Sequence, residues 1–327
     1  MKALSLFNGI SALHLALYKA EIEVSQVYYA EIDKYANKIT EKHYPDDVAL
    51  GDVTKWREWD IDWDDIGLVG AGFPCQAWSV AGKQLGDKDE RGMLFWTTLE
   101  IIAHVLKRNP SAKFLMENVK MKKDFEQYIT HHTEQALGHV EKTLINSALV
   151  SAQNRQRYYW TNFEITQPED KGVLLKDIIE SDFVDRDKSY CIDANYHKGG
   201  NLDQYFNKSR RQLVFRPCEL RENSKPADSG LWHVENATDI KGHEQRKRVY
   251  SAEGKAPTLQ TCGGGNHEPK IYAEQLKYRK LTPLECERLQ TFPCGWTDSI
   301  SNTQRYKALG NAWTVDVIVH ILKCAFN

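Results

Sequence analysis

The residue best suited to covalent chemistry in this chain is Cys75, within Gly72-Phe73-Pro74-Cys75 and directly after the apolar run 66–69. A strand that ends in small residues would place the thiol at the carboxyl edge of a sheet, where open α/β folds bind ligands. Pro74 fixes one backbone angle and Gly72 permits a tight turn, so the sulfur would be held in place. Cys75 is therefore a candidate nucleophile. The alternative is a buried structural thiol, the usual state of a lone cysteine.

A carboxylate stands at the end of a second predicted strand, 113–119, where Glu117 precedes Asn118-Val119. If the sheet is parallel, Glu117 and Cys75 lie on the same edge. Glu117 is then either an acid/base group in an apolar pocket or a cap for the helix that follows Lys120. Both roles stay open at this point.

Three donor side chains alternate through 151–160, at Gln153, Arg155 and Arg157. Alternation on a strand sends all three to one face. Such a row makes a planar donor array for phosphate or a base carbonyl. The alternative is a salt-bridge ladder on the surface.

The segment after Cys75 contains Gly82, Gly86 and Gly92 with basic residues between them. It is too polar for a core and too rich in glycine for a good helix. This composition predicts a mobile, partly basic lid over the candidate nucleophile.

The elements that would position these groups begin with a strand–turn–helix unit: an apolar strand at 4–7, the turn Asn8-Gly9 and a helix at 11–17. Glu31 follows the turn at the spacing where an acidic side chain accepts both hydroxyls of an adenosyl ribose. Asp52 ends a further strand and could accept from an exocyclic amine. The pattern favours nucleotide or nucleoside binding, although a single glycine after a strand is common.

Further helices are predicted at 93–108, 124–138 and 312–326, with strands at 24–32 and 140–150. A helix over 282–290 has Thr282 as N-cap and Glu285 at the third position, as in a capping box. From about residue 166 long helices give way to turns and basic clusters. We therefore expect a first domain of residues 1–165 plus 305–327 and a smaller, loop-rich domain of residues 166–304.

The composition is that of an ordinary α/β protein, with a net charge of −2. Residues 204–250 nevertheless carry 10 Lys/Arg against 6 Asp/Glu, which would suit a local basic face. Seven cysteines without a C-x-x-C pair argue against a disulfide framework and a standard zinc site, so no metal is expected. We found no apolar stretch that approaches the length of a bilayer span, so no membrane partner is expected.

Taken in order, these features resemble the DNA cytosine-5 methyltransferase family over nearly the whole chain. The motifs that carry the resemblance are Leu6-Phe7-Asn8-Gly9, Glu31, Asp52, Phe73-Pro74-Cys75-Gln76, Arg91-Gly92-Met93-Leu94-Phe95, Glu117-Asn118-Val119, Gln153-Asn154-Arg155-Gln156-Arg157, the segment 280–293 and Gly310-Asn311. The resemblance implies a Rossmann-like, doubly wound α/β catalytic domain and a target-recognition domain. Asn8 and Ser11 depart from the family pattern, which has an acidic residue and a glycine there.

The resemblance also implies roles for residues. Cys75 would be the nucleophile, Glu117 the acid, and Arg155 and Arg157 the groups that orient the target base. S-adenosylmethionine would be bound by Phe7, Asn8, Gly9, Ile10, Glu31, Ile32, Asp52, Val53, Pro74, Leu94, Asn311, Ala312 and Trp313. DNA would be contacted by Gln76, Ser79, Lys83, Arg91, Gln153, Gly264 and Gly265.

The implied reaction is methyl transfer from S-adenosylmethionine to C5 of a flipped cytosine in double-stranded DNA, through a bond between Cys75 and C6. The expected setting is the cytoplasm of a bacterial or phage-infected cell, with a monomeric enzyme and a cognate restriction endonuclease. Three alternatives stay open: methylation of transfer RNA, a catalytically silent partner module of the same fold, and a nicotinamide oxidoreductase that shares the strand–turn–helix start.

Overall fold

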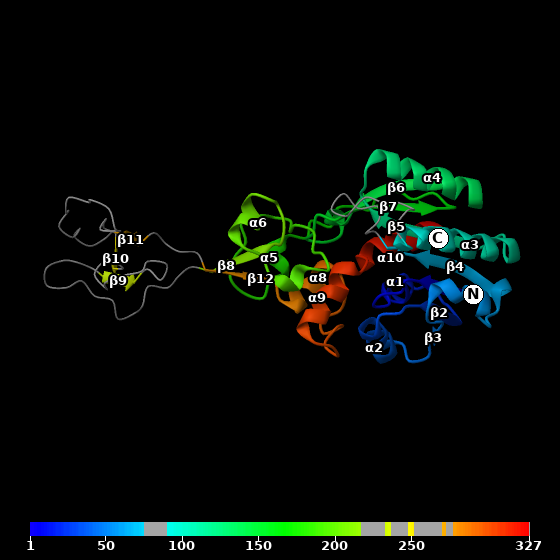
Figure 1. Ribbon diagram of the computed structural model, residues 1–327, viewed down its shortest axis with the longest axis horizontal. Coiled ribbons are helices and arrows are strands. Elements are labelled where there is room, and N and C mark those ends of the chain that lie inside the picture. The colour runs from blue at the N-terminus through cyan, green and yellow to red at the C-terminus, as the bar shows by residue number, and fades with distance from the viewer. Residues whose placement is uncertain (75–89, 217–232, 237–247, 252–269, 273–276, 327) are drawn as a thin grey trace. The chain divides into compact units, whose positions relative to one another are not determined.

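A computed structural model of the chain describes residues 1–74, 90–216, 233–236, 248–251, 270–272 and 277–326 (Figure 1). The α-helices are α1 (Ala12–Lys19), α2 (Lys34–His43), α3 (Glu90–Arg108), α4 (Lys123–Leu137), α5 (Leu175–Ile178), α6 (Leu202–Phe206), α8 (Pro283–Leu289), α9 (Asn302–Asn311) and α10 (Val315–Phe326). The strands are β1 (Lys2–Leu6), β2 (Gln26–Ala30), β3 (Val48–Ala49), β4 (Ile66–Ala71), β5 (Lys113–Val119), β6 (Glu141–Asn146), β7 (Gln156–Thr161), β8 (Leu213–Arg216), β9 (His233–Asn236), β10 (Arg248–Ser251), β11 (Lys270–Tyr272) and β12 (Lys277–Lys280). Short 3-10 helices are η1 (Val53–Glu58), η2 (Trp63–Asp65), η4 (Ser147–Leu149) and η5 (Tyr196–Lys198).

A seven-stranded sheet in the order β3-β2-β1-β4-β5-β7-β6 forms the centre of the larger compact unit. Strands β1 to β5 are parallel, and β7 runs antiparallel to both β5 and β6. The order reverses direction between β1 and β4, which is where open α/β sheets bind ligands, beyond the carboxyl ends of the strands. This is the Rossmann-like, doubly wound α/β sheet that the sequence predicted.

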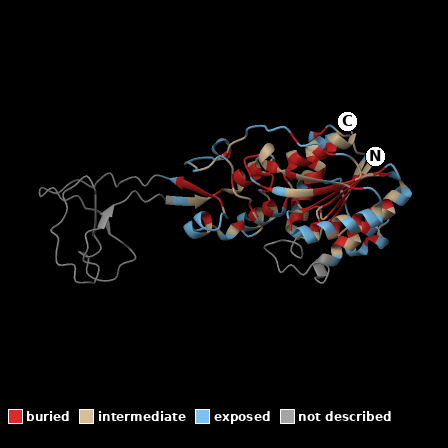
Figure 2. Ribbon diagram, turned by 90° about the horizontal axis from the view of Figure 1, so that it is seen from above, coloured by how far each residue is buried: buried red, intermediate tan, exposed pale blue. Residues whose placement is uncertain are grey.

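The core lies on both faces of this sheet, which helices cover (Figure 2). Short runs of apolar residues with no polar alternation are typical of parallel strands buried on both faces. Helix α1 packs against α10, and α3 packs against α4. Fully buried side chains in this core include Leu4, Leu6, Val69, Phe95, Ile102, Phe114 and Met116.

Most helices and strands begin and end within a few residues of the predicted positions. The exception is a strand that is ended early by a hydrogen bond between a side chain and the backbone. The strand expected over 140–150 ends at Asn146, whose side-chain oxygen accepts from the amide of Ala148 and starts a 3-10 turn. Strand β7 consequently begins only at Gln156. Helix α3 begins at Glu90, so the end of the predicted lid is helical; residues 76–89 of that lid lie outside the described part of the chain.

The chain divides into two compact units. The first comprises Met1–Glu180, Arg186–Leu213 and Lys280–Asn327, and the second comprises Ser181–Asp185 and Val214–Arg279. The range predicted for the second domain, 166–304, thus includes three segments that belong to the first unit: 166–180, 186–213 and 280–304. One of them is held there because Ser189 pairs with Gln153 and Leu281 donates its amide to the Tyr196 hydroxyl.

The second unit contains most of β8 and β12, which pair with each other, and the small sheet β11-β10-β9. Phe183 and Phe215 exchange backbone hydrogen bonds of 2.9 and 2.8 Å. Asp182 accepts from the guanidinium groups of Arg216 and Arg279. These contacts anchor the described ends of this unit to one another.

Within the described residues, the stretch Asn302–Phe326 has the length and composition of a membrane span, contrary to our expectation that none would. The stretch is not one helix, because α9 and α10 are separated at Ala312, which is extended. Half of the apolar window is buried inside the structure. Ile318, Ile321 and Leu322 are fully buried, and their helix packs on α1, so these apolar residues serve the core.

Candidate active site

A cavity of about 490 Å³ opens at the carboxyl ends of β1 to β5. It lies at the switch point of the strand order, where the topology of a doubly wound sheet leaves a crevice. The lining combines the strand–turn–helix unit with residues from the far end of the chain. Its members are Phe7, Gly9, Ile10, Ala30, Glu31, Ile32, Asp33, Tyr35, Ala36, Gly51, Asp52, Val53, Gly72, Phe73, Pro74, Leu94, Glu117, Val119, Arg155, Arg157, Gln304, Lys307, Ala308, Gly310 and Asn311.

The turn after β1 is built from left-handed residues. Phe7, Gly9 and Ser11 have φ angles of 55°, 58° and 64°. Strain of this kind at non-glycine residues persists where neighbouring contacts hold it. The Asn8 amide donates to the hydroxyls of Ser11 and Thr40 at 3.3 and 3.1 Å, and those hydroxyls lie 2.7 Å apart. Asn8 therefore supports the turn from behind, whereas its neighbours line the cavity.

Glu31 locks this turn to the end of β2. Its carboxylate accepts from the amides of Gly9, Ile32 and Asp33 at 2.8–2.9 Å. A carboxylate has about four acceptor sites, so these bonds leave room for one further donor. The adjacent side chain of Ile32 is 77 % exposed and belongs to the cavity lining.

Asp52 and Val53 form the next part of the wall. The Asp52 side chain caps η1 by accepting from the amide and hydroxyl of Thr54, both on Oδ1. Val53 is buried and supplies an apolar surface beside it. The cavity thus presents an acidic acceptor and an apolar wall next to each other.

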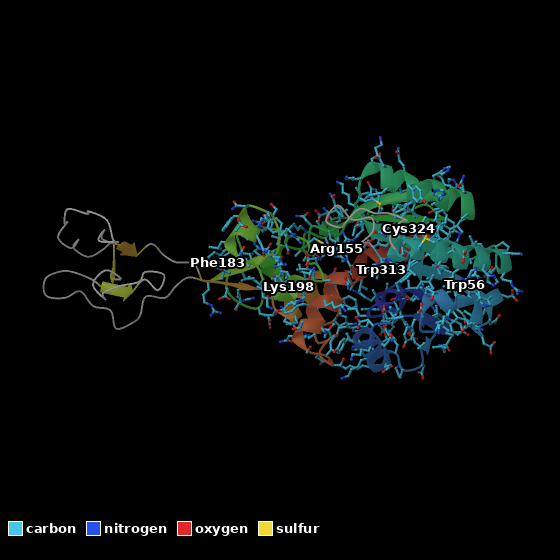
Figure 3. All side chains as sticks on the ribbon, in the orientation of Figure 1. Trp56, Arg155, Phe183, Lys198, Trp313 and Cys324 are labelled. Atoms are coloured by element: carbon cyan, nitrogen blue, oxygen red, sulfur yellow. The ribbon has the colours of Figure 1, made fainter. Side chains whose placement is uncertain are left out.

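Glu117 faces the same cavity from β5 and is 8 % exposed. Its Oε1 lies 2.9 Å from Nε of Arg157, and its Oε2 accepts from the indole of Trp313 at 3.0 Å. Figure 3 labels Trp313 near the centre of the larger unit. Helix α4 is capped at Lys122 without a side-chain bond, so Glu117 is not its cap. Of the two roles left open for Glu117, the helix cap is therefore excluded, and its carboxyl group lies at the sheet edge in the cavity lining.

Asn118 was missed by the sequence analysis, although it sits beside Glu117 in the motif that we quoted. Its side chain is buried and donates to the carbonyl of Phe73 at 3.2 Å. This bond ties the end of β5 to the residues just before Cys75. Pro74 lines the cavity.

Several predicted residues fall outside the described part of the chain: Cys75, Gln76, Ser79, Lys83, Gly264 and Gly265. Arg91 lies in the first turn of α3, and its side chain is not among those described.

The predicted donor array is not formed, and this prediction is wrong. Gln153 is fully buried, and its amide contacts the Leu289 carbonyl and accepts from the amide of Ile192. Gln153 precedes β7, so strand alternation does not apply to it. Its burial also rules out the predicted contact with DNA.

Arg155 is 4 % exposed, and its guanidinium donates to the carbonyls of Ile192, Gly310 and Ala312. These bonds hold the segment before α10 against the cavity. Arg157, two residues on, instead pairs with Glu117. The two arginines thus have different surroundings, although the sequence analysis gave them the same role.

Of the residues 310–313, only the first two belong to the cavity lining. Gly310 and Asn311 line the cavity, whereas Ala312 and Trp313 do not. Gly310 is required by a close approach, because a Cβ there would lie 2.2 Å from the carbonyl carbon of Asp193. This packing delivers Asn311 to the cavity from the far end of the chain.

Cys191 was not singled out by the sequence analysis, yet it borders the site. Its Sγ lies 3.4 Å from Nη1 of Arg155 and 4.0 Å from Nη2 of Arg157. Burial acts to raise the pKa of this thiol, but the two guanidinium groups outweigh it and hold the pKa below its ordinary value. The sequence has no motif around Cys191, so its position beside Arg155 and Arg157 could be found only from the folded structure.

Among the residues that the structure describes, no group of three or more His, Cys, Asp or Glu side chains could hold a metal ion.

Comparison with known proteins identifies the class. The family model described as C-5 cytosine-specific DNA methylase matches residues 1–327. The type II methyltransferase M1.ScrFI of Lactococcus lactis subsp. cremoris is 32% identical over 97% of this chain and 76% of its own. The type II methyltransferase M.HhaI of Haemophilus parahaemolyticus is 30% identical over 98% of this chain and 93% of its own.

Solved structures agree on the fold. The methyltransferase EhMeth of Entamoeba histolytica superposes with a TM-score of 0.64 at 15% identity, over 100% of this chain and 98% of that one. A DNMT2 mutant of Spodoptera frugiperda gives 0.61 at 20% identity, over 100% and 99% of the two chains.

The chain belongs to the C-5 cytosine-specific DNA methylase family. It is an enzyme, a cytosine-5 DNA methyltransferase, as its relatives among the type II methyltransferases also indicate. The nicotinamide oxidoreductase and the methylation of transfer RNA are not favoured by this membership.

Proposed function

We propose that the cavity binds S-adenosylmethionine beside a flipped cytosine of double-stranded DNA. The observation that carries the proposal is that one cavity is lined both by Glu31 and Asp52 and by Glu117 and Arg157. The first pair suits the adenosyl half of a methyl donor, and the second suits a base. A shared cavity would let the two reactants meet without a further movement of the sheet.

The lining fits S-adenosylmethionine. The remaining acceptor site of Glu31 suits a ribose hydroxyl, and Asp52 suits the adenine amine. Apolar walls for the purine come from Phe7, Ile32 and Leu94, and the lining is completed by Gly9, Ile10, Val53, Pro74, Gly310 and Asn311. When bound, this compound supplies an electrophilic methyl group on a sulfonium.

Cys75 would activate the base, because C5 of cytosine is a poor nucleophile until electron density reaches it. The Cys75 thiolate adds to C6, which moves a pair of electrons toward C5 and N3. Once C5 carries the transferred methyl group, loss of the C5 proton to a base and expulsion of Cys75 would restore the aromatic ring. Pro74, which precedes Cys75, lines the cavity, and this supports the role of Cys75 as the nucleophile.

Glu117 would donate a proton to N3 as charge develops there, and would take it back when Cys75 leaves. Arg157 would hold the Glu117 carboxyl and the base together, since its Nε contacts Oε1. We assign Arg155 a supporting role, because its guanidinium is committed to backbone carbonyls.

DNA recognition is assigned to the second unit, Ser181–Asp185 and Val214–Arg279, together with residues before α3 and in its first turn. A target base inside a duplex is stacked and paired, so it must be flipped out at a cost of about a few kcal/mol. Basic residues would hold phosphates and make affinity depend on salt. The proposed contacts are Gln76, Ser79, Lys83, Arg91, Gly264 and Gly265.

The wider setting is also a proposal. Relatives named as type II methyltransferases suggest a restriction-modification system, with a cognate endonuclease as a separate protein. We further propose a monomeric enzyme in the cytoplasm of a bacterial or phage-infected cell. A protein named as an orphan methyltransferase of Bacillus phage SPbeta is also similar to this chain, with 28% identity over 99% of this chain and 97% of its own, which supports the phage alternative for the setting.

The test is transfer of labelled methyl from S-adenosylmethionine to unmethylated duplex DNA and, in parallel, to transfer RNA. We expect label in DNA only, and none with Cys75→Ala. Sequencing of the labelled DNA then gives the target site. Label in transfer RNA alone would overturn the DNA proposal, and label in neither substrate, with S-adenosylmethionine still bound, would leave a silent module.

A further inference from the structure

The carboxyl group of Glu117 is held from both sides. Arg157 contacts Oε1 at 2.9 Å, and the indole Nε1 of Trp313 donates to Oε2 at 3.0 Å. An indole N–H is a donor only, so Trp313 can offer Glu117 nothing but this bond. Rotation of the carboxyl group about its last torsion would break both contacts.

Room for the indole is provided by Gly72, which directly follows β4. A Cβ at Gly72 would lie 2.8 Å from Trp313 Nε1, and 3.2 and 3.3 Å from two carbons of the same ring. The first distance is shorter than side chains tolerate, so a larger residue at 72 would displace the N–H from Glu117. Gly72 thus serves the indole as well as the turn before Cys75.

The backbone that carries Trp313 is fastened by hydrogen bonds from side chains of two other segments. The carbonyl of Ala312 accepts from Arg155 at 2.8 Å and from the Gln290 amide at 3.2 Å. The Thr314 hydroxyl donates to the side-chain oxygen of Gln290 at 2.8 Å. The indole is therefore presented by a fixed segment, and it does not line the cavity as Asn311 does.

We propose that Trp313 is a positioning residue for Glu117, and not a cofactor contact as its motif suggested. The inference rests on the proposed role of Glu117 as the acid at N3. With one oxygen on Arg157 and the other on Trp313, the carboxyl group is aimed before the base arrives. Side chains held in this way by surrounding contacts keep a reactive geometry that loose ones lose.

The first experiment compares Trp313→Phe with the parent enzyme. The ring is kept and the N–H is removed, so we expect kcat to fall about 10- to 100-fold, as misplacement of a catalytic group does. The Kd for S-adenosylmethionine, measured by calorimetry, should stay within about twofold because the indole is outside the cavity. A fall in affinity that accounts for the loss of kcat/KM would overturn the inference, as would an unchanged kcat.

Gly72→Ala tests the same contact from the other side. It should reproduce the fall in kcat by pushing the indole away from Oε2. Gly67→Ala, in β4, is the matched control: the three atoms nearest to its Cβ, at 2.9–3.3 Å, all belong to the Met1 side chain, so the substitution does not press on the indole. Normal thermal unfolding of each variant confirms that it folds. If Gly67→Ala and Gly72→Ala lose the same activity, the effect is one of strand packing and the inference is wrong.

A double-mutant cycle with Glu117→Gln separates this inference from the proposed function. If Trp313 acts through Glu117, Trp313→Phe should cost about twofold or less in the Glu117→Gln background, so the two losses are not additive. Full additivity would overturn the inference while leaving the acid role intact. A Glu117→Gln variant that is as fast as the parent would instead remove the acid role itself.

Discussion

Arg155 and Ala312 are joined by a hydrogen bond of 2.8 Å across 157 residues of sequence. The same guanidinium donates to the carbonyls of Gly310 and Ile192. Three segments that are distant in the chain meet at this buried side chain, near the centre of the larger unit (Figure 3). The contact fixes the wall of the cavity from which Asn311 projects.

We expect Arg155→Lys to destabilise the fold. A lysine cannot reproduce the fork of donors, so buried carbonyls lose their partners, at about 1–3 kcal/mol for each unsatisfied group. Equilibrium unfolding in urea measures this loss. Arg157→Lys is the matched control: it should leave stability much closer to that of the parent and reduce turnover instead. Equal stability losses for the two variants would contradict the division of roles.

Gly310→Ala should also destabilise the enzyme. Its Cβ would lie 2.2 Å from the Asp193 carbonyl carbon and 2.5 Å from the Ala194 nitrogen, and backbone atoms cannot swing aside. Forced displacement of packed groups costs about 1–3 kcal/mol or more. Thermal unfolding and the Kd for S-adenosylmethionine should both worsen, because Asn311 moves with its neighbour. A Gly310→Ala variant as stable as the parent enzyme would show that the backbone relaxes at no cost.

Glu31→Gln should weaken binding of S-adenosylmethionine about tenfold or more. A carboxamide has one acceptor oxygen where a carboxylate has two. In Glu31→Gln the NH₂ group would therefore face a backbone N–H that now donates to the carboxylate. We expect kcat at saturating donor to change less than the Kd. Calorimetric titration provides the Kd, and the exposed Glu23→Gln is the control for a simple loss of charge. Unchanged affinity in Glu31→Gln would remove Glu31 from the proposed binding residues.

The thiols of Cys191 and Cys286 should respond differently to alkylation. Arg155 and Arg157, acting against burial, lower the pKa of Cys191, whereas burial and then the nearby Glu285 raise the pKa of Cys286. Because the thiolate is the reactive form, Cys191 should reach half of its limiting rate at a lower pH than an ordinary thiol. Peptide mapping by mass spectrometry after pulses of iodoacetamide measures each site in the folded enzyme.

Arg157→Leu should move this midpoint for Cys191 upward, since it removes one of the two positive charges. Cys286 should stay unmodified until the protein is denatured. If the midpoint for Cys191 does not move, the guanidinium of Arg157 does not govern that thiol.

Asp182→Asn should loosen the second unit, and only above acidic pH. Hydrogen bonds from Arg216 and then Arg279 hold the pKa of Asp182 well below its ordinary value. A carboxylate with a lowered folded pKa stabilises fully above its unfolded value of about 3.9, and its contribution is lost as the pH falls through the folded value. Hydrogen exchange of the Phe183 and Phe215 amides, which bond across this site, should be faster in Asp182→Asn at pH 7.

The difference between Asp182→Asn and the parent should shrink as the medium is acidified below about pH 4. The exposed Asp60→Asn provides the control for a change in net charge alone. A difference that is constant from neutral to strongly acidic pH would contradict an electrostatic origin.

Local patterns predicted much of the fold because their signals come from neighbouring residues. Thr282 and Glu285 form the expected capping box at the start of α8, and the apolar run after Lys113 forms β5 with the predicted limits. The placement of Glu117 at the carboxyl end of β5 followed from the same reasoning. These features depend on spacing of a few residues, which a sequence displays directly.

The roles within the donor motif could not be predicted in this way. Gln153, Arg155 and Arg157 alternate as on a strand, yet the first two are buried among backbone groups and the third reaches Glu117. The side chain of Asn146 starts the turn that delays β7, and the partners of Arg155 lie far along the chain. Packing against distant segments, and not alternation along a strand, therefore determines where these three side chains lie.

By itself, the sequence determined the family, the doubly wound sheet and the identities of the groups that meet at its edge. The tertiary structure decided which of them share the cavity, that Trp313 turns its indole to Glu117, and that Arg155 supports the wall. The physical reason is that these two contacts join residues far apart in the chain, 196 positions for Trp313 and Glu117 and 157 for Arg155 and Ala312. Such contacts have no period or spacing for a sequence to show.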